Sequence, residues 1–147
     1  MDTIFKSKFF NELDVHELYE IIRAREEIFL LEQGIVCRDL DRVDYDALHC
    51  FIEQDGKILA YLRAYKTDRA GVAKVGRVLS ITHGAGLGVR IMHSALPQIK
   101  TKLGCYTVKI SAQKHAQGFY EKLGFVTTSD EYLEENVPHV AMILESI

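Results

Sequence analysis

A glycine-rich segment between a strand-like and a helix-like stretch is the part of the sequence best suited to chemistry. Its glycines allow the backbone to approach a ligand closely and to expose successive N–H groups. The helical pattern that follows adds unpaired N–H donors and the positive end of a helix dipole. Together these features predict an anion site suited to a pyrophosphate. The segment reads His83, Gly84, Ala85, Gly86, Leu87 and Gly88.

Two common nucleotide-binding motifs do not describe this loop. It lacks the GK[ST] ending of a P-loop, and its glycine spacing differs from the dinucleotide fingerprint. The strands before it are joined as hairpins, whereas that fingerprint requires a βαβ unit. On its own the loop is equally compatible with a tight turn that binds nothing.

The cysteines and histidines indicate no metal site. Three cysteines, Cys37, Cys50 and Cys105, occur without a CxxC or HExxH spacing, and the six histidines are scattered. An odd cysteine count without a secretory signal favours free thiols in a reducing compartment. We therefore expect neither disulfides nor a bound metal, and a cytoplasmic location.

The elements that position the loop begin with a short strand over residues 8–13. Asp14 and Glu17 then form the pattern of a helix N-terminal capping box. Apolar residues at helical spacing predict the buried face of this helix, and Arg25 interrupts that face, either by snorkelling or for a partner. The expected buried residues are Val15, Leu18, Tyr19, Ile22 and Phe29.

Three strands that pair in sequence come next. Residues 48–53 and 57–65 are strand-like and are joined by Asp55–Gly56, a strong hairpin signal. Residues 72–81 continue the meander up to the glycine loop.

Two helices and three further strands complete the pattern. A helical pattern runs from Leu87 to Leu103, with Pro97 expected to kink or shorten it. A strand over 105–110, a helix over 113–123 and strands near 125–133 and 138–145 follow. This order predicts an α+β fold, a mostly antiparallel mixed sheet with helices on its faces.

Length and composition support one soluble domain over residues 1–147. The chain is 48% hydrophobic and 27% charged, and no apolar run approaches a membrane span. Its net charge of −3 hides three blocks: residues 1–50 carry 6 basic and 12 acidic side chains, 51–125 carry 12 and 4, and 126–147 carry 0 and 5. Nucleic acid and membrane partners are disfavoured. The blocks are either solvated surface or two patches, a basic one for an anion and an acidic one for a cation.

The loop in this setting resembles the acyl-CoA pyrophosphate loop, R/Q-x-x-G-x-G/A, of the GNAT superfamily of N-acetyltransferases. His83 takes the usual Arg or Gln position, and the link from Arg77 and Val78 to the glycines is about two residues shorter than in the family. A second resemblance, to the "xxFYxxxGF" of the last helix, lies in residues 117–125, and the strand order is also that of GNAT enzymes.

Several motifs narrow the resemblance to the ElaA-like branch. Residues 25–33 resemble its "RxxVFxxEQ" helix end, and Asp39, Asp41 and Asp44 resemble its acidic loop. Residues 76–78, 112–113 and 137–142 resemble its central strand, its "AQ" and its "IPHxxM". The three aspartates are either a solvated loop or a rim that attracts a cationic amine.

The resemblance implies acetyl-CoA as co-substrate, bound where the fourth and fifth strands splay apart. One backbone N–H of residues 78–80 would polarise the thioester carbonyl. Tyr120 would protonate the leaving thiolate, and a base would deprotonate the amine. The implied cofactor-binding residues are Val78, Leu79, Ser80, His83, Gly84, Ala85, Gly86, Leu87, Gly88, Val89 and Tyr120, with Arg77, Arg90, Lys114 and Lys122 as candidates for the phosphates.

The base and the acceptor site are less defined. His139 and Glu32 are the candidate bases, and Arg25, Glu32 and His139 are the candidate substrate-binding residues. Alternatively, His139 is a half-buried structural histidine, and Arg25 and Glu32 are part of a buried ion pair that shapes the first helix.

The function that this resemblance implies is acetyl transfer from acetyl-CoA to a primary amine of a small molecule or peptide. The alternative is a non-catalytic acyl-CoA sensor or partner-binding module of the same fold. An acyl-homoserine-lactone synthase shares the fold, but no residues beyond the loop match. An exposed sheet edge offers a route to a homodimer.

Overall fold

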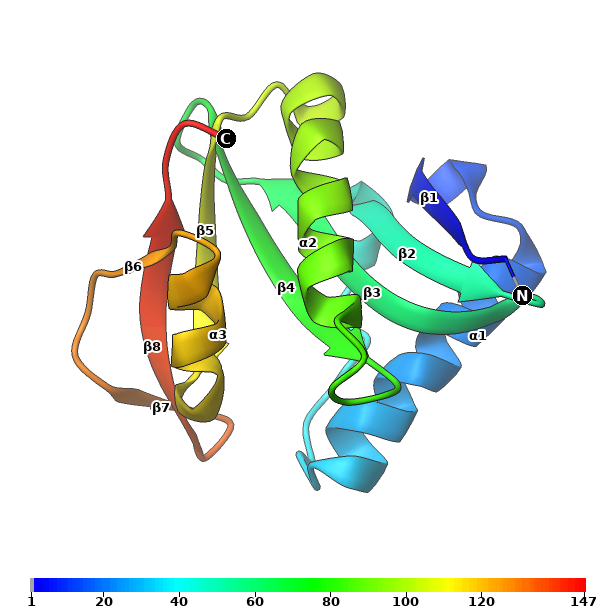
Figure 1. The fold of residues 1–147 in the computed structure, drawn as a ribbon, viewed down its shortest axis with the longest axis horizontal. Helices are drawn as coiled ribbons and strands as arrows, with labels where there is room; N and C mark the ends of the chain where they lie inside the picture. The colour runs from blue at the N-terminus through cyan, green and yellow to red at the C-terminus, as the bar shows by residue number, and fades with distance from the viewer. Residues whose placement is uncertain (1) are drawn as a thin grey trace.

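The computed structural model describes residues 2–147 as one mixed sheet with helices on both faces (Figure 1). The sheet has eight strands, which confirms the predicted fold class. The strands are β1 (Ile4–Phe9), β2 (Leu48–Gln54), β3 (Lys57–Lys66), β4 (Val72–Ser80), β5 (Thr107–Gln113), β6 (Val126–Thr127), β7 (Tyr132–Glu134) and β8 (Val137–Leu144). The α-helices are α1 (Val15–Arg25), α2 (Leu87–Gln98) and α3 (Gln117–Lys122).

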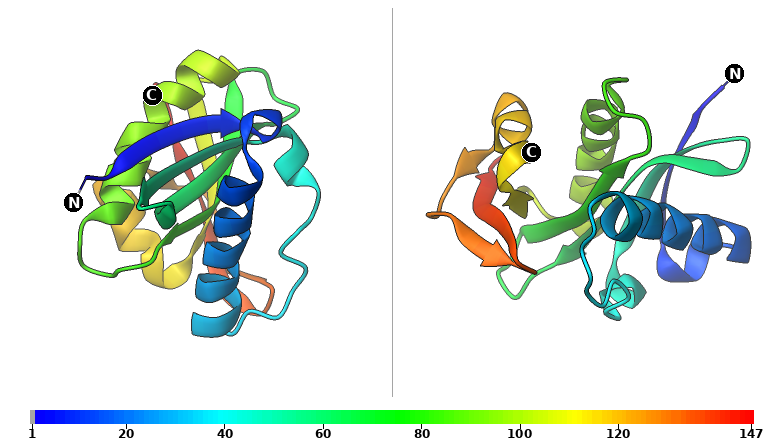
Figure 2. Two further views of the ribbon diagram at one scale, coloured as in Figure 1. Left: turned by 90° about the vertical axis from the view of Figure 1, so that its right-hand side faces the viewer. Right: turned by 90° about the horizontal axis from the view of Figure 1, so that it is seen from below.

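The strand order places a parallel pair in the middle of an otherwise antiparallel sheet. The order is β1-β2-β3-β4-β5-β8-β6, with β7 paired to β8. The β2–β3 hairpin turns at Asp55 and Gly56, both at positive φ, as the dipeptide predicts. Only β4 and β5 run parallel, and α2 makes the crossover between them. Figure 2 shows α1 on one face of the sheet and α2 and α3 on the other.

The central strands separate toward their carboxyl ends. Pairing of β4 with β5 runs only from Val72 opposite Thr107 to Val75 opposite Ile110. Both strands then continue without each other, β4 to Ser80 and β5 to Gln113, and Figure 1 shows them diverging. The sheet is therefore split between the carboxyl ends of β4 and β5, near the start of α2.

The face of α1 that packs on the sheet is only partly the predicted one, since Leu18, Ile22 and Phe29 are half-buried. Val15 and Tyr19 are 77% and 69% exposed, whereas two charged residues, Glu17 and Arg25, are buried together with Ile21, Ala24 and Ile28. Their burial is compatible with packing because each is paired. Lys6 and Lys8 of β1 each bind Glu17 at 2.9 Å, and Arg25 binds aspartates described below. The apolar periodicity was outweighed by ion pairs made with distant segments.

The first strand begins earlier than predicted, whereas the start of α1 and the end of α2 agree with the sequence signals. The first strand lies at Ile4–Phe9, before the predicted 8–13, and residues 10–12 form a 3₁₀ turn. The capping box of Asp14 and Glu17 is confirmed. The α-helical ladder of α2 ends one residue after Pro97, and a wider π-helical turn (Ile99–Leu103) completes the helix before Gly104. Thus Pro97 shortens the α-helix as expected.

Candidate active site

A cleft of about 540 Å³ lies at the splayed ends of β4 and β5. Its walls come from the segment after α1, from β3, β4 and β5, from α3 and the turn before it, and from the β7–β8 hairpin. Residues from widely separated parts of the chain therefore meet where the sheet opens. This is the arrangement expected of a binding cleft in a sheet that is split at its centre.

The β4 wall of the cleft contains a bulge. Gly76 pairs with Arg63 of β3 and Leu79 pairs with Tyr61, so two β4 residues, Arg77 and Val78, face the single Leu62. Arg77 has a φ of 51°, a left-handed conformation that is uncommon for a residue with a Cβ atom. Such a bulge takes a residue out of the ladder and re-aims its backbone groups.

The glycine-rich loop leads from β4 into α2 and fits an anion. Gly84 and Gly86 have φ of 80° and 74°, and no atom lies within 4 Å of where their Cβ atoms would be. The first N–H groups of α2, at Leu87 to Val89, have no acceptor within the helix by virtue of their position. The loop therefore offers backbone donors beside open space, as a pyrophosphate site requires.

Gly88 explains how the loop meets the last helix. A Cβ atom at Gly88 would lie 3.0 Å from Cζ of Phe119, in α3. The missing side chain thus lets α2 begin directly against the Phe119–Tyr120 pair. Apart from Tyr120, which lies on α3, the predicted cofactor residues lie along this one path, from the end of β4 to the first turn of α2. Leu79 is buried under α1, so only its backbone is available to a ligand.

His83 and Glu32 contact each other, which the sequence did not indicate. His83 Nε2 lies 2.9 Å from Glu32 Oε1, and both side chains are exposed. Glu32 ends the π-helical turn (Glu26–Glu32) that follows α1, and it does not line the cleft. The structure therefore places this predicted base beside the glycine loop, apart from the cleft.

Tyr120 lies in the cleft wall with its hydroxyl free of protein partners. The side chain is 8% exposed and makes edge contacts with Phe119 and Phe125. Within residues 2–147 no group hydrogen-bonds its hydroxyl. Burial raises the pKa of Tyr120, so the phenol keeps its proton at neutral pH and can donate it.

His139 lies in the opposite wall, where β8 faces β7. Its Nδ1 is 2.7 Å from the carbonyl oxygen of Val137, so Nδ1 carries a proton that it donates. Its Nε2 lies 3.5 Å from a carboxylate oxygen of Glu134, and its ring stacks on Tyr132. Nε2 is thus the nitrogen able to accept a proton, with a carboxylate beside it.

Ser111, Tyr132 and Glu134 are site residues that the sequence did not reveal. The Ser111 hydroxyl contacts the Tyr132 hydroxyl and donates to the other Glu134 oxygen at 3.1 Å. Their chain separation carries no recognisable motif. They are brought together by the registers of two strands on β8: β7, with Tyr132 opposite His139, and β5, with Ser111 opposite Ala141.

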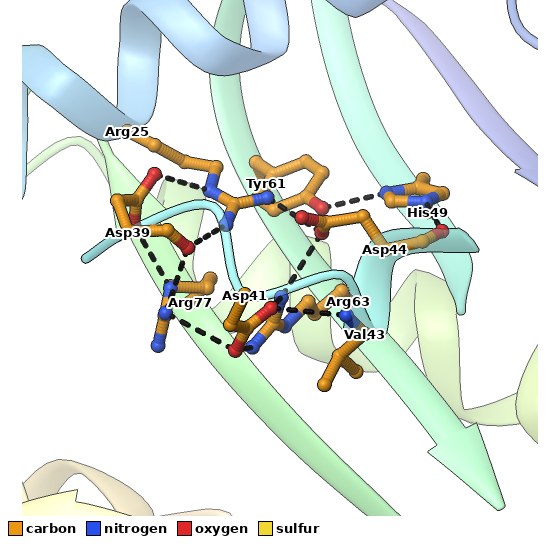
Figure 3. A network of polar contacts seen from close by, with 9 residues as sticks. All are labelled: Arg25, Asp39, Asp41, Val43, Asp44, His49, Tyr61, Arg63 and Arg77. Carbon is orange, nitrogen blue, oxygen red and sulfur yellow. Dashed lines mark hydrogen bonds and ion pairs between the residues drawn. The ribbon is translucent and has the colours of Figure 1, made fainter. Parts of the chain in front are cut away.

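The aspartates of the acidic loop are paired with arginines, although Asp39 and Asp41 remain partly exposed in the cleft lining, so they form neither a purely solvated loop nor a rim of unpaired carboxylates. Asp39 accepts hydrogen bonds from Arg25 Nε at 3.0 Å and Arg77 Nε at 2.9 Å, one on each carboxylate oxygen (Figure 3). Its backbone carbonyl accepts a second bond from each arginine, both at 2.9 Å. Arg25 is 1% exposed and does not line the cleft, whereas its partner Asp39 does.

Asp44 and Asp41 complete the network with Arg63. Buried Asp44 accepts from Arg25 Nη1 at 2.7 Å and from Arg63 Nη1 at 3.0 Å. Burial acts to raise the pKa of Asp44, but the bonds from Arg25 and Arg63 outweigh it and lower the pKa. Asp41 binds Arg63 through both oxygens, at 2.8 and 2.7 Å, and this lowers the pKa of Asp41 to about 2. Each of the three aspartates is therefore paired with at least one arginine of the same chain.

Three of the predicted phosphate partners are engaged with the protein. Arg77 binds Asp39, the Arg90 guanidinium contacts the Thr3 hydroxyl, and Lys114 donates to Gln117 at 2.7 Å. Within residues 2–147 no group of three His, Cys, Asp or Glu side chains is placed to hold a metal ion. None of the helices described is long and apolar enough to cross a membrane.

Comparisons with known proteins agree on one family. Residues 38–146 match the family model described as Acetyltransferase (GNAT) domain. The UPF0039 protein C11D3.02c of Schizosaccharomyces pombe is 36% identical over 145 residues, covering 96% of each chain. The crystal structure of an acyl-CoA N-acyltransferase from Pseudomonas aeruginosa has a TM-score of 0.88 at 34% identity, covering 97% of this chain and 99% of that one. The crystal structure of Escherichia coli ElaA has a TM-score of 0.89 at 28% identity, covering 98% and 100%. With this fold, this cleft and these relatives, the chain belongs to the GNAT acyltransferase family, with ElaA and UPF0039 proteins among its homologues.

Proposed function

We propose that this protein transfers the acetyl group of acetyl-CoA to a primary amine, by direct attack of the amine within a ternary complex. The observation that carries this proposal is the opening between β4 and β5. On one side it leads to the open glycine loop, and on the other to a cleft holding a partner-free Tyr120 hydroxyl and His139.

The coenzyme side is supported by the path from β4 to α2. The backbone N–H groups of residues 84–89 would bind the pyrophosphate, and residues 78–80 would hold the pantetheine arm along the unpaired edge of β4. His83 stands where the family usually has Arg or Gln. Because the backbone supplies most donors at such a loop, a neutral His83 is compatible with binding.

The reactive step is assigned to three groups. The Val78 N–H, at the bulge, would polarise the thioester carbonyl and stabilise the oxyanion that develops on it. His139 Nε2 would take the proton of the substrate ammonium, and the Glu134 carboxylate beside it would stabilise the resulting imidazolium. Tyr120 would give its proton to the thiolate as the carbon–sulfur bond breaks. The amine nitrogen gains the acetyl group and gives up its second proton, which restores the Tyr120 phenol. Coenzyme A leaves as the thiol, and His139 returns its proton to solvent.

The acceptor side is supported by the walls of the cleft near His139. With Asp39 and Asp41 neutralised, the carboxylates left to attract an ammonium are Glu134 and Glu135 of the β7–β8 turn. The class of acceptor that fits is therefore a primary amine on a small molecule or an extended peptide end. We assign substrate contact to His139 rather than to Arg25 or Glu32.

The experiment that tests the function combines binding and turnover. Thermal unfolding with acetyl-CoA and with coenzyme A measures binding, since a ligand of the folded state raises Tm. Thiol release is then followed with a panel of small amines and peptides. Amine-dependent thiol release with an acetylated product is expected; coenzyme binding without it across the panel would instead support an acyl-CoA sensor.

A further inference from the structure

The bulge at Arg77 is held by bonds from outside its own strand. A left-handed φ in a residue with a Cβ atom persists only when its surroundings fix it. Arg77 Nε donates to Asp39 Oδ1, and its Nη2 donates to the Asp39 carbonyl oxygen, both at 2.9 Å. Two bonds from one guanidinium to one residue fix the direction in which the Arg77 side chain leaves β4.

Asp39 is itself fixed from the opposite side. Arg25 Nε donates to its Oδ2 at 3.0 Å and Arg25 Nη2 to its carbonyl oxygen at 2.9 Å. Arg25 has almost no exposed surface, and Asp44 accepts its remaining nitrogen. Figure 3 shows the resulting chain of contacts, in which the loop residue Asp39 lies between an arginine of α1 and an arginine of β4.

We propose that Arg77 is a positioning residue for acyl transfer: its bonds to Asp39, anchored by Arg25, hold the β4 bulge so that the Val78 N–H faces the thioester carbonyl. This role rests on the proposed function. A donor that stabilises an oxyanion must already be in position before the reaction, because moving it during the reaction would cost free energy and reduce the stabilisation. A residue that fixes the bulge therefore contributes to catalysis without touching the substrate.

The competing role for Arg77 is direct contact with substrate, since its side chain lines the cleft and is a quarter exposed. The contacts favour positioning. Nε and Nη2 are bonded to Asp39, and Nη2 also lies 3.5 Å from Asp41 Oδ2. The two roles predict different kcat values for alanine and glycine at position 77, since both substitutions remove the guanidinium but only glycine adopts positive φ readily.

The test compares Arg77→Ala with Arg77→Gly. Both variants lose the guanidinium, but glycine adopts positive φ without a Cβ penalty and so retains the bulge more readily. For Arg77→Ala we expect kcat to fall about 10²-fold, the scale of one lost oxyanion donor. For Arg77→Gly we expect at least a tenfold recovery relative to alanine, with KM for acetyl-CoA similar in both. Arg69→Ala, in the exposed β3–β4 turn, is the control. Equal kcat in the alanine and glycine variants would overturn the positioning role.

A second readout does not depend on turnover. Hydrogen exchange of a peptide covering residues 76–80 should be faster in Arg77→Ala and in Asp39→Asn than in the parent protein and Arg69→Ala. Far-UV circular dichroism verifies that each variant is folded. Unchanged exchange in both variants would overturn the proposal that the Arg77–Asp39 bonds hold the bulge, whether or not an acceptor amine is found. Faster exchange in both variants, together with a parent protein that acetylates no amine, would instead overturn the proposed function and leave the role of the Arg77–Asp39 bonds intact.

Discussion

Removing the Asp44 carboxylate should destabilise the fold far more than removing a neighbouring carboxylate on the surface. Asp44 is buried and is the one residue that joins Arg25 to Arg63, at 2.7 and 3.0 Å. Breaking a buried ion pair by deleting one partner costs about 3–5 kcal/mol, because the other charge stays buried. Each arginine keeps a second aspartate, Asp39 or Asp41, so we expect Asp44→Ala to cost about 3 kcal/mol, the lower end of that range.

The assay is urea unfolding followed by far-UV circular dichroism, with Asp46→Ala as control. Asp46 is exposed in the same 3₁₀ turn (Val43–Asp46), so its replacement should change the free energy of unfolding by less than about 0.5 kcal/mol. The Tm of Asp44→Ala should fall by about 6–12 °C for a chain of this size. If Asp44→Ala lies within about 1 kcal/mol of Asp46→Ala, the network contributes little to stability and this reasoning is refuted.

The pH dependence follows from the lowered pKa of Asp44. A carboxyl whose pKa is lower in the folded protein adds stability above its unfolded pKa of about 3.9 and loses it as pH falls through the folded pKa. The difference between parent and Asp44→Ala should therefore be complete at pH 7 and shrink below about pH 4. A difference that grows in acid would show that the sign is wrong.

Three further predictions concern the cleft and the loop. Tyr120→Phe should lower kcat by about 10²-fold while acetyl-CoA affinity persists, because only the proton donor is lost; unchanged turnover would remove Tyr120 from this role. His139→Ala should abolish the ascending limb of the pH–rate profile, whereas Glu32→Gln should keep it; the opposite pattern would make Glu32 the base. Gly88→Ala should weaken acetyl-CoA binding measured by calorimetry, because the added Cβ would lie 3.0 Å from Phe119 and displace the loop. The control Gly118→Ala, with open space around its Cβ, should bind normally. Equal affinities in the two variants would show that packing of the loop on α3 does not matter for coenzyme binding.

Local signals in the sequence predicted the parts of the fold that depend on few neighbours. The capping box of Asp14 and Glu17, the Asp55–Gly56 turn and the glycine loop each act within a few residues. The motifs around Tyr120 and His139 indicated the family, and the resemblance to that family implied that the fourth and fifth strands splay apart. Such features are readable because the chain itself brings their partners together.

The buried face of α1 was not readable for the opposite reason. Glu17 and Arg25 take positions that apolar side chains would normally hold, and their partners lie on β1 and in the loop after the helix. Periodicity scores the polarity of each residue alone. It contains no information on whether a charge will meet its counter-ion in the folded protein.

The role of the charge blocks was not readable for the same reason. From the sequence, the acidic and basic blocks were either solvated surface or two patches for two ligands. Arg63 and Arg77 of the basic segment instead bind Asp39, Asp41 and Asp44, so part of each block neutralises the other. Which charges remain for ligands depends on strand register and on the Arg77 bulge, neither of which spacing reveals.

A crystal structure of the protein with coenzyme A bound would test the proposed site most directly. We expect the pyrophosphate on the backbone N–H groups of residues 84–89, and the thiol sulfur within hydrogen-bond distance of the Tyr120 hydroxyl, facing the cleft that holds His139. A coenzyme bound elsewhere, or a sulfur remote from Tyr120, would contradict this expectation.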